Sequence, residues 1–543
     1  MPDASAGITS ARPDRRRIFM AALQAAAAAV GKNGRPVLYG ANGKPLAPVG
    51  AESYQFRRTA ARRSGSLKNW IPKRLVSDTQ AATERELIVA RSMDLAGSDA
   101  HAAGILDTFA VTIVGGGLAP HPLLDADMLD MPGDAVDRLR RAQKSIHRDW
   151  SPTADAGGRM TFAALQYLAQ RCLLLYGEFL FLVPMLADDP LRPYSLALQP
   201  ICPLRLKTPL DMSADPNIRD GVEVGPYGEP VAYWIKKASP TGWPTLDTDA
   251  NFVRIPARVG RRHNVLHGFI ANDPEQVRGM PFFAPAIKLF RDLSDYLDAE
   301  LVSNIVTAAF SLFIETGAAD PSFPAAGLAT FTGAEAKGDG GTFERRYQEL
   351  VPGQIMFGDA GQKPHPIAAN RPGTTFEPFV KVIEHSIAMS LGVPYPVLFK
   401  NLEGMTYASY RSAMLEAWRL FKARRTWLAQ AFCAPVWRML MEEAWLRGDL
   451  PVNDYYGRET ALTAAEWIGP PKGQIEPVKE VQADILAVQH NLKSREEVML
   501  EADRDLTATF RRLAAEEALM EDLGLDETKM ENPPQEKNSD ATD

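Results

Sequence analysis

Cysteine, histidine and long apolar runs are all scarce in this chain of 543 residues, which has three cysteines and eight histidines. An odd number of cysteines, each within an apolar run, argues against a disulfide framework. It predicts buried free thiols at Cys172, Cys202 and Cys433. No apolar run reaches the roughly 18–20 residues of a membrane-spanning helix. Glu178 and Asp107 interrupt the two best candidates, so we expect no membrane partner.

The common catalytic signatures are also missing. The pairs Gly31-Lys32 and Gly43-Lys44 are not followed by the Ser or Thr of a phosphate-binding loop. No H-E-x-x-H, G-x-S-x-G or paired C-x-x-C occurs. His263 and His267 have no carboxylate or cysteine at metal-ligand spacing, so we predict a structural role for them. The sequence therefore predicts no enzyme, no catalytic residue, no cofactor and no metal site.

Charge is distributed unevenly along the chain, whose formal net charge is −7. Residues 1–75 hold 14 Lys and Arg against 3 Asp and Glu, a net of +11, so residues 76–543 carry −18. Residues 476–543 alone hold 18 acidic and 8 basic side chains. A protein that grips DNA phosphates needs a basic groove over its folded part. If DNA is a partner here, it is repelled or allowed to slide.

The basic N-terminus has two interpretations. Arg15-Arg16-Arg17, followed by Ile18-Phe19-Met20 and alanines as far as Val30, matches a twin-arginine export signal. The same residues suit a basic, alanine-rich helix, since alanine is the best helix former. We favour the helix because nothing downstream is typical of an exported protein.

Apolar spacing predicts an α+β fold that is mainly helical. A helix runs from Thr83 until Gly115-Gly116-Gly117 reverses the chain, and aromatic residues within 407–447 are expected in the core. The other predicted elements are a helix passing into a strand over 159–181, a hairpin over 221–234, a helix over 284–315, a hairpin joining 350–357 to 363–367, helices over 376–391 and 407–447, amphipathic helices to 523, and an acidic disordered tail.

Several blocks, in this order, carry a family resemblance. They are Arg91–Leu95, Val114–Leu118, Thr161–Gln166, Tyr176–Glu178, Val265–Phe269, Gln276–Pro281, Asp292–Tyr296, Asn370–Phe376, Leu391–Tyr395, Tyr407–Ala413 and Phe432–Trp437. Over roughly residues 80–505 the chain resembles the lambda family of phage portal proteins. Two segments depart from the family pattern, Gly97–Asp99 and residues 317–345.

The resemblance implies a portal fold with wing, helical stem, small α/β clip and helical crown. The implied parts are a basic, weakly ordered arm (1–75), the wing (76–280), a stem helix (281–316), the clip (317–374), a second stem helix (375–392), a channel loop (393–406), a long helix returning to the wing (407–450), crown helices (451–525) and an acidic tail (526–543).

The resemblance also implies a function. Such subunits form a ring, here expected to be a dodecamer, at one capsid vertex of the virion after assembly in the bacterial cytoplasm. The implied partners are double-stranded DNA bound without sequence specificity, the terminase large subunit, major capsid and scaffold proteins, and head–tail connector proteins. In the channel loop the implied DNA-facing residues are Lys400, Asn401, Glu403 and Gly404. In the clip the implied docking residues are Arg345, Arg346 and Gln354.

Two alternatives stay open at this point. One is another head-completion or minor capsid protein, against which the long, interrupted stem pattern argues. The other is a packaging nuclease, which would need a phosphate-binding loop and a metal-binding carboxylate cluster. The phosphate-binding loop is missing from the sequence.

Overall fold

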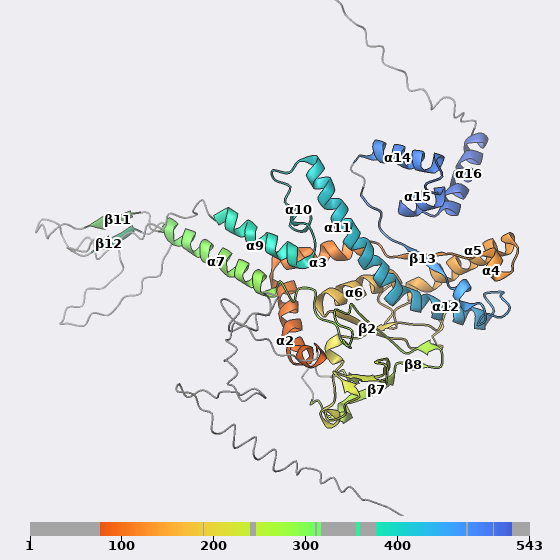
Figure 1. The fold of residues 1–543 in the computed structure, drawn as a ribbon, viewed down its shortest axis with the longest axis horizontal. Helices are drawn as coiled ribbons and strands as arrows, with labels where there is room; N and C mark the ends of the chain where they lie inside the picture. Colours follow the sequence, from red (N-terminus) through yellow and green to blue (C-terminus); the bar gives the residue numbers. More distant parts are fainter. Residues whose placement is uncertain are drawn as a thin grey trace, which may run out of the picture. The chain divides into compact units, whose positions relative to one another are not determined.

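The computed structural model describes residues 77–187, 189–238, 246–309, 312–315, 355–358, 376–473, 476–502 and 504–523. These ranges form a mixed α+β fold that is mostly helical (Figure 1). The predicted N-terminal arm, the docking residues Arg345, Arg346 and Gln354, most of the 317–374 segment and the acidic tail lie outside the described residues.

The helix predicted from Thr83 to the triple glycine is two helices, α2 (Ser77–Ser98) and α3 (Ala100–Ile113). Asp99 interrupts it with an extended backbone, and its carboxylate accepts a hydrogen bond from the Ala102 amide at 2.8 Å as an N-cap. The chain reversal after α3 is confirmed. Gly117 has a φ of 116°, and a Cβ there would lie 2.5 Å from the Cβ of Ala163.

The main core forms around helices whose buried faces combine aliphatic side chains with a few large aromatic rings. These elements are α5 (Gly133–Trp150), α6 (Phe162–Leu175), α11 (Tyr407–Leu428), the π-helical turn η7 (Ala429–Cys433) and α12 (Ala434–Arg447). Phe162, Phe432 and Trp437 are fully buried among them. The prediction that the aromatic residues of 407–447 build the core is therefore confirmed for Phe421, Phe432 and Trp437. None of the helices in these ranges is long and apolar enough to cross a membrane.

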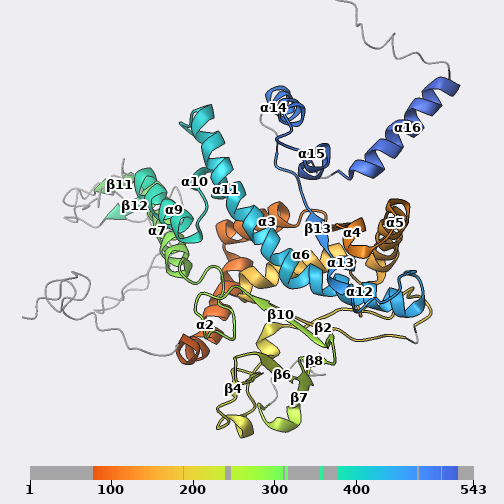
Figure 2. The ribbon, with the colours of Figure 1, turned by 45° about the vertical axis from the view of Figure 1, so that its right-hand side comes forward.

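Short antiparallel strands connect the helices (Figure 2). Strand β2 (Glu178–Leu182) follows α6 as predicted and pairs with β10 (Val265–Phe269). The hairpin predicted over 221–234 is confirmed by the pairing of Val222 with Tyr233. The remaining strands of this region are β3 (Gln199–Pro200), β4 (Ile218–Arg219), β5 (Val222–Val224), β6 (Pro230–Lys236), β7 (Phe252–Pro256), β8 (Arg258–Val259) and β9 (Arg262–His263).

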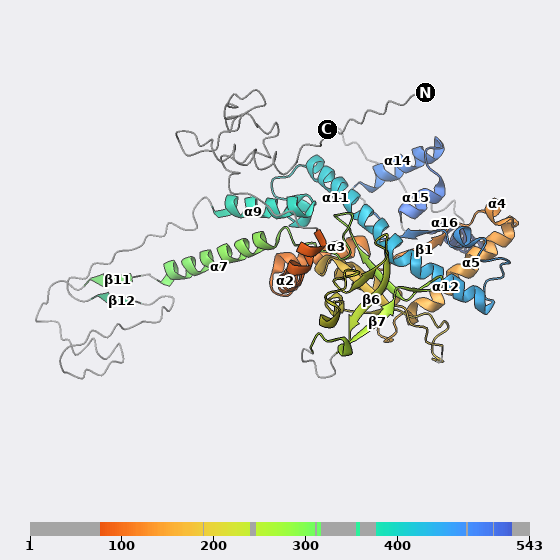
Figure 3. The ribbon, with the colours of Figure 1, turned by 60° about the horizontal axis from the view of Figure 1, so that its bottom comes forward.

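Helices α7 (Ile287–Ala309) and α9 (Phe376–Leu391) lie side by side (Figure 3). The ring of Tyr296 stacks on Phe376, with centroids 5.7 Å apart, and meets Phe379 edge-on. The helix predicted to reach residue 315 ends instead at Ala309. Residues Leu312–Glu315 form β11, which pairs in parallel with β12 (Ile355–Gly358). The other strand of the predicted hairpin, 363–367, lies outside the described residues.

The segment predicted as the crown, 451–525, contains elements of two kinds. Strand β13 (Ala465–Ile468) pairs with β1 (Ala119–Pro122), and α13 (Glu459–Leu462) places Leu462 in the main core. Three helices then follow, α14 (Pro477–Gln489), α15 (Arg495–Glu501) and α16 (Leu506–Asp522). No described side chain of these three helices is buried. The prediction of buried cysteines is confirmed for Cys433 and wrong for Cys202, which is exposed, and Cys172 is only half-buried.

His147 makes part of the core sensitive to acid. It lies among aromatic rings, and its buried Nε2 has no hydrogen-bond partner among the described residues. Burial lowers its pKa from 6.5 to about 4. Because the unfolded chain binds this proton more readily, stability is complete above pH 6.5 and is lost as the pH falls toward 4. The loss amounts to about 3 kcal/mol.

Urea titrations at pH 7 and pH 4.5 measure the free energy of unfolding at each pH. We expect this free energy to fall less between the two pH values in His147→Phe than in the native chain. The exposed His490 provides the control, since His490→Phe should keep the native acid dependence. If His147→Phe kept the native pH dependence of stability, His147 would not be the cause of the acid sensitivity.

Candidate functional site

Residues 393–406 connect α9 to α11 and fall into two parts. The first part is anchored, because Val393 and Leu398 are buried and residues Tyr395–Leu398 form the single turn α10 after Pro394. The second part, from residue 399 onward, is largely exposed. Lys400 (φ 55°) and Gly404 (φ 70°) both adopt left-handed backbone there. For Lys400, which has a Cβ, this conformation is uncommon and is typical of a functional or tightly constrained loop.

Tyr395 holds the exposed part of the loop against α9. Its ring stacks on His385, with centroids 4.0 Å apart. Its hydroxyl donates to Glu384 Oε2 at 3.0 Å and accepts from Asn401 Nδ2 at 3.1 Å. Burial and the hydrogen bond to Glu384 raise the pKa of Tyr395, so the hydroxyl keeps its proton and donates. Asn401 Oδ1 in turn accepts from the Glu403 amide at 3.0 Å, which closes the turn.

The predicted loop residues differ in how they are held. The Glu403 carboxylate lies 3.5 Å from Lys381 Nζ, and Lys381 also pairs with Glu377 on α9. Lys400 is exposed and forms no ion pair with a residue in the described ranges. The structure therefore brings Asn401 and Glu403 together at Tyr395 and Lys381, and leaves Lys400 facing solvent.

Sequence reasoning missed Tyr395 and Lys381 as part of this loop site. Tyr395 ends the block Leu391–Tyr395, but nothing in its local pattern shows that its hydroxyl reaches Asn401. Lys381 lies one helical turn after Glu377, which predicts only an ordinary pair within a helix.

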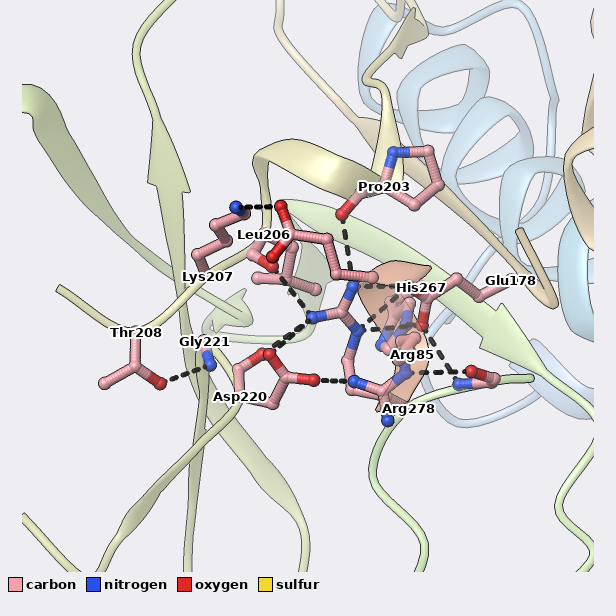
Figure 4. Close-up of polar contacts among 12 residues, drawn as sticks. Arg85, Glu178, Pro203, Leu206, Lys207, Thr208, Asp220, Gly221, His267 and Arg278 are labelled. Carbon is pink, nitrogen blue, oxygen red and sulfur yellow. Dashed lines mark hydrogen bonds and ion pairs between the residues drawn. The ribbon is translucent and has the colours of Figure 1, made fainter. Parts of the chain in front are cut away.

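A second polar cluster is buried in the protein (Figure 4). Arg278 Nε donates to both carboxylate oxygens of Glu178 at 2.9 Å. Its other nitrogens donate to the carbonyls of Leu206, Asp220 and Pro203 at 2.8, 2.7 and 3.1 Å. The cluster thus ties β2 to the chain segments that precede β5 and α7.

His267 and Arg85 complete this cluster. His267 Nε2 lies 3.0 Å from Glu178 Oε2, and Arg85 of α2 pairs with Asp220 and donates to the Gly279 carbonyl. Burial alone would raise the pKa of Glu178, but the Arg278 charge and the hydrogen bonds from His267 and Arg278 hold it well below its usual range. These residues hydrogen-bond to one another, and none of them lines the cavity beside α3 and α11 or the cavity beside α14 and α15. The predicted structural role of His267 agrees with this geometry.

Metal-binding groups and cavities are the remaining candidates for a site in the described ranges. No group of three or more His, Cys, Asp or Glu side chains there is placed to hold a metal ion. A cavity of about 350 Å³ between α3 and α11 is lined mainly by apolar side chains such as Val111, Met414 and Trp418. The exposed loop at 399–406, with its left-handed Lys400 and its contacts to Tyr395 and Lys381, is therefore the candidate functional site.

Sequence comparison relates this chain to known proteins. The family described as "Phage portal protein, lambda family" matches residues 63–425. The "Probable portal protein" of Halomonas phage phiHAP-1 is 25% identical over 420 residues, covering 75% of this chain and 76% of the relative. The "Portal protein" of Escherichia phage N15 is 24% identical, covering 64% and 66%. "Portal protein B" of Escherichia phage lambda is 22% identical, covering 83% and 87%.

Solved structures of a gene transfer agent particle are also similar. A chain from the virion of the native particle shares 18% identity at a TM-score of 0.38, covering 79% of this chain and 94% of that one. A chain from the neck of the empty particle shares 16% identity at a TM-score of 0.39, covering 76% and 93%. The family assignment depends on the sequence matches.

Proposed function

This chain belongs to the lambda family of phage portal proteins, and we propose that its copies form a closed ring around a channel for the phage genome. Proteins of this family are structural components of the phage virion, so the chain is a virion component and not an enzyme. The ring, its dodecameric size and its docking partners belong to the proposal.

Exposed apolar side chains on α7 and α9 support the ring most strongly. On α7 these are Leu301, Val302 and Ile305, and on α9 they are Phe379, Val382 and Met389, the last 83% exposed. Two neighbouring helices with so much uncovered apolar surface are typical of a protein interface. When one face of a subunit binds a different face of the next, the contacts close into a ring if the rotation is right. The two helices would then be the stem.

The charge pattern supports a channel that does not hold DNA tightly. The −18 carried by residues 76–543 repels phosphate, so DNA can slide through under the action of a motor. Lys400 is a cation that forms no ion pair with a described residue. It lies on the loop that Tyr395 holds through Asn401. We propose that Lys400, Asn401, Glu403 and Gly404 face the passing duplex.

The remaining parts of the proposal concern the clip, the wing and the N-terminal segment. We propose that residues 317–374 form the clip, with Arg345, Arg346 and Gln354 docking the terminase large subunit and later the head–tail connector proteins. The wing and the C-terminal helices would meet the major capsid and scaffold proteins during assembly in the host cytoplasm. The N-terminal segment, residues 1–75, would be the basic arm.

Val382→Asp tests the ring. An aspartate on this exposed face would have to be desolvated at every subunit contact. We expect the dissociation constant of each contact to rise by roughly tenfold or more, which shifts the chain from rings to smaller species. Light scattering with size-exclusion chromatography measures the shift. Tyr227→Asp is the matched control, since Tyr227 lies 96% exposed at the tip of the β5–β6 turn. Rings of unchanged stability in Val382→Asp would contradict the proposed interface.

A further inference from the structure

His121 lies between two carboxylates that belong to the C-terminal helices. It is 4% exposed on β1. Its Nε2 is 3.0 Å from Glu496 Oε1 of α15, and its Nδ1 is 3.2 Å from Asp505 Oδ2 just before α16. Lys144 of α5 pairs with the same Asp505 oxygen. One buried side chain therefore contacts two consecutive parts of a segment that is remote in the sequence.

The two contacts need a protonated ring. A neutral imidazole has one N–H donor and one lone pair, whereas an ionised carboxylate only accepts hydrogen bonds. Only the imidazolium can donate to Glu496 and Asp505 together. When the ring loses its proton, a lone pair faces one of the two carboxylates. Histidine side chains change charge between about pH 5 and pH 8.

Little else in the described structure attaches α15 and α16 to the core. No described side chain of either helix is buried, so apolar packing contributes little. Lys493 pairs with Asp484 and Glu501 inside the C-terminal segment itself. The ion pair of Arg411 with Glu476, at 3.6 Å, lies before α14. Attachment of α15 and α16 is thus mainly ionic.

We propose that His121, Lys144, Glu496 and Asp505 form a pH-sensitive latch that holds α15 and α16 against β1 and α5. The protonated ring holds both carboxylates. With a neutral ring, Lys144 still holds Asp505, but the imidazole donates to only one carboxylate and the two helices loosen. Two other charged residues contact or pair with the segment that carries His121. Glu466 is opposite His121 in the β1–β13 pairing, and Arg140 donates to the carbonyls of Pro122 and Leu124.

This latch does not depend on the proposed ring function and can be tested on the full chain. Hydrogen–deuterium exchange at pH 6 and pH 8, corrected for intrinsic exchange rates, reports the protection of the amides in 495–522. We expect about tenfold more protection at pH 6, as charge-assisted hydrogen bonds of this kind allow. His121→Gln should show low protection at both pH values. His490→Gln, at an exposed histidine that follows α14, should keep the native difference.

Glu496→Gln separates the latch from a general loss of structure. Its amide can donate to the lone pair of a neutral His121, so we expect protection to persist at pH 8 and the pH difference to disappear. Equal protection of the native chain at the two pH values would overturn the latch. So would a full native pH difference in His121→Gln or in Glu496→Gln.

Discussion

A chain lacking Lys400–Gly404 should still assemble and enter capsids but fail to package or retain DNA. The deletion removes the exposed part of the loop and leaves Val393, Tyr395 and Leu398, which anchor the loop to the core. Folding and subunit contacts should therefore survive. In a complementation assay, DNA-filled particles should fall to background while empty particles of normal composition accumulate.

A second variant separates loop chemistry from loop length. Replacing Lys400–Gly404 with Gly-Ser-Gly-Ser-Gly keeps five residues but removes the charges and the Asn401 hydrogen bond to Tyr395. If the side chains matter, this variant should also lose filled particles. Normal packaging by the deletion variant would contradict the assigned role, and so would failure of the rings to form, since the loop would then be a folding element.

Arg278→Met should cause the largest loss of stability of any single change considered. It removes the charge that neutralises buried Glu178 and leaves the carbonyls of Leu206, Asp220 and Pro203 without this donor. Breaking a buried pair by removing one partner costs about 3–5 kcal/mol in the free energy of unfolding. Chemical denaturation followed by tryptophan fluorescence measures the loss.

Arg254→Met is the matched control for Arg278→Met. Arg254 also pairs with a carboxylate, that of Glu223, at 2.8 and 2.9 Å, but on the exposed surface. Exposed pairs contribute about 1 kcal/mol or less. The double variant Glu178→Leu with Arg278→Met should be less destabilised than Arg278→Met alone, because no unpaired carboxylate stays buried. Equal losses for Arg278→Met and Arg254→Met would show that the buried cluster does not stabilise the fold.

Local patterns explain which parts of the fold could be predicted. Helix α9 has the predicted bounds, 376–391, because its apolar spacing begins and ends within the segment itself. The passage from α6 to β2 through Gly177 and the β5–β6 hairpin were predicted for the same reason. Each depends on residues close together in the sequence.

The features that could not be predicted from the sequence depend on contacts between residues far apart in the chain. Residues 312–315 continue the helical spacing of α7, yet they form a strand because β12 lies beside them. Strand β13 joins the core through β1, more than 340 residues earlier in the chain. Glu178 and Arg278 are 100 residues apart, and His121 and Asp505 are 384 apart, so no local pattern relates them. The hydroxyl of Tyr395 could not be placed at Asn401 without the turn that α10 makes.

Electron microscopy of the purified full chain tests the portal assignment most directly. A subunit with uncovered apolar faces on α7 and α9 should associate into closed rings of uniform size with a central hole, twelvefold in averaged top views. The Val382→Asp variant, imaged separately at the same protein concentration, should show few rings. A native chain that stays monomeric at all protein and salt concentrations, or that forms only open or irregular assemblies, would contradict the account.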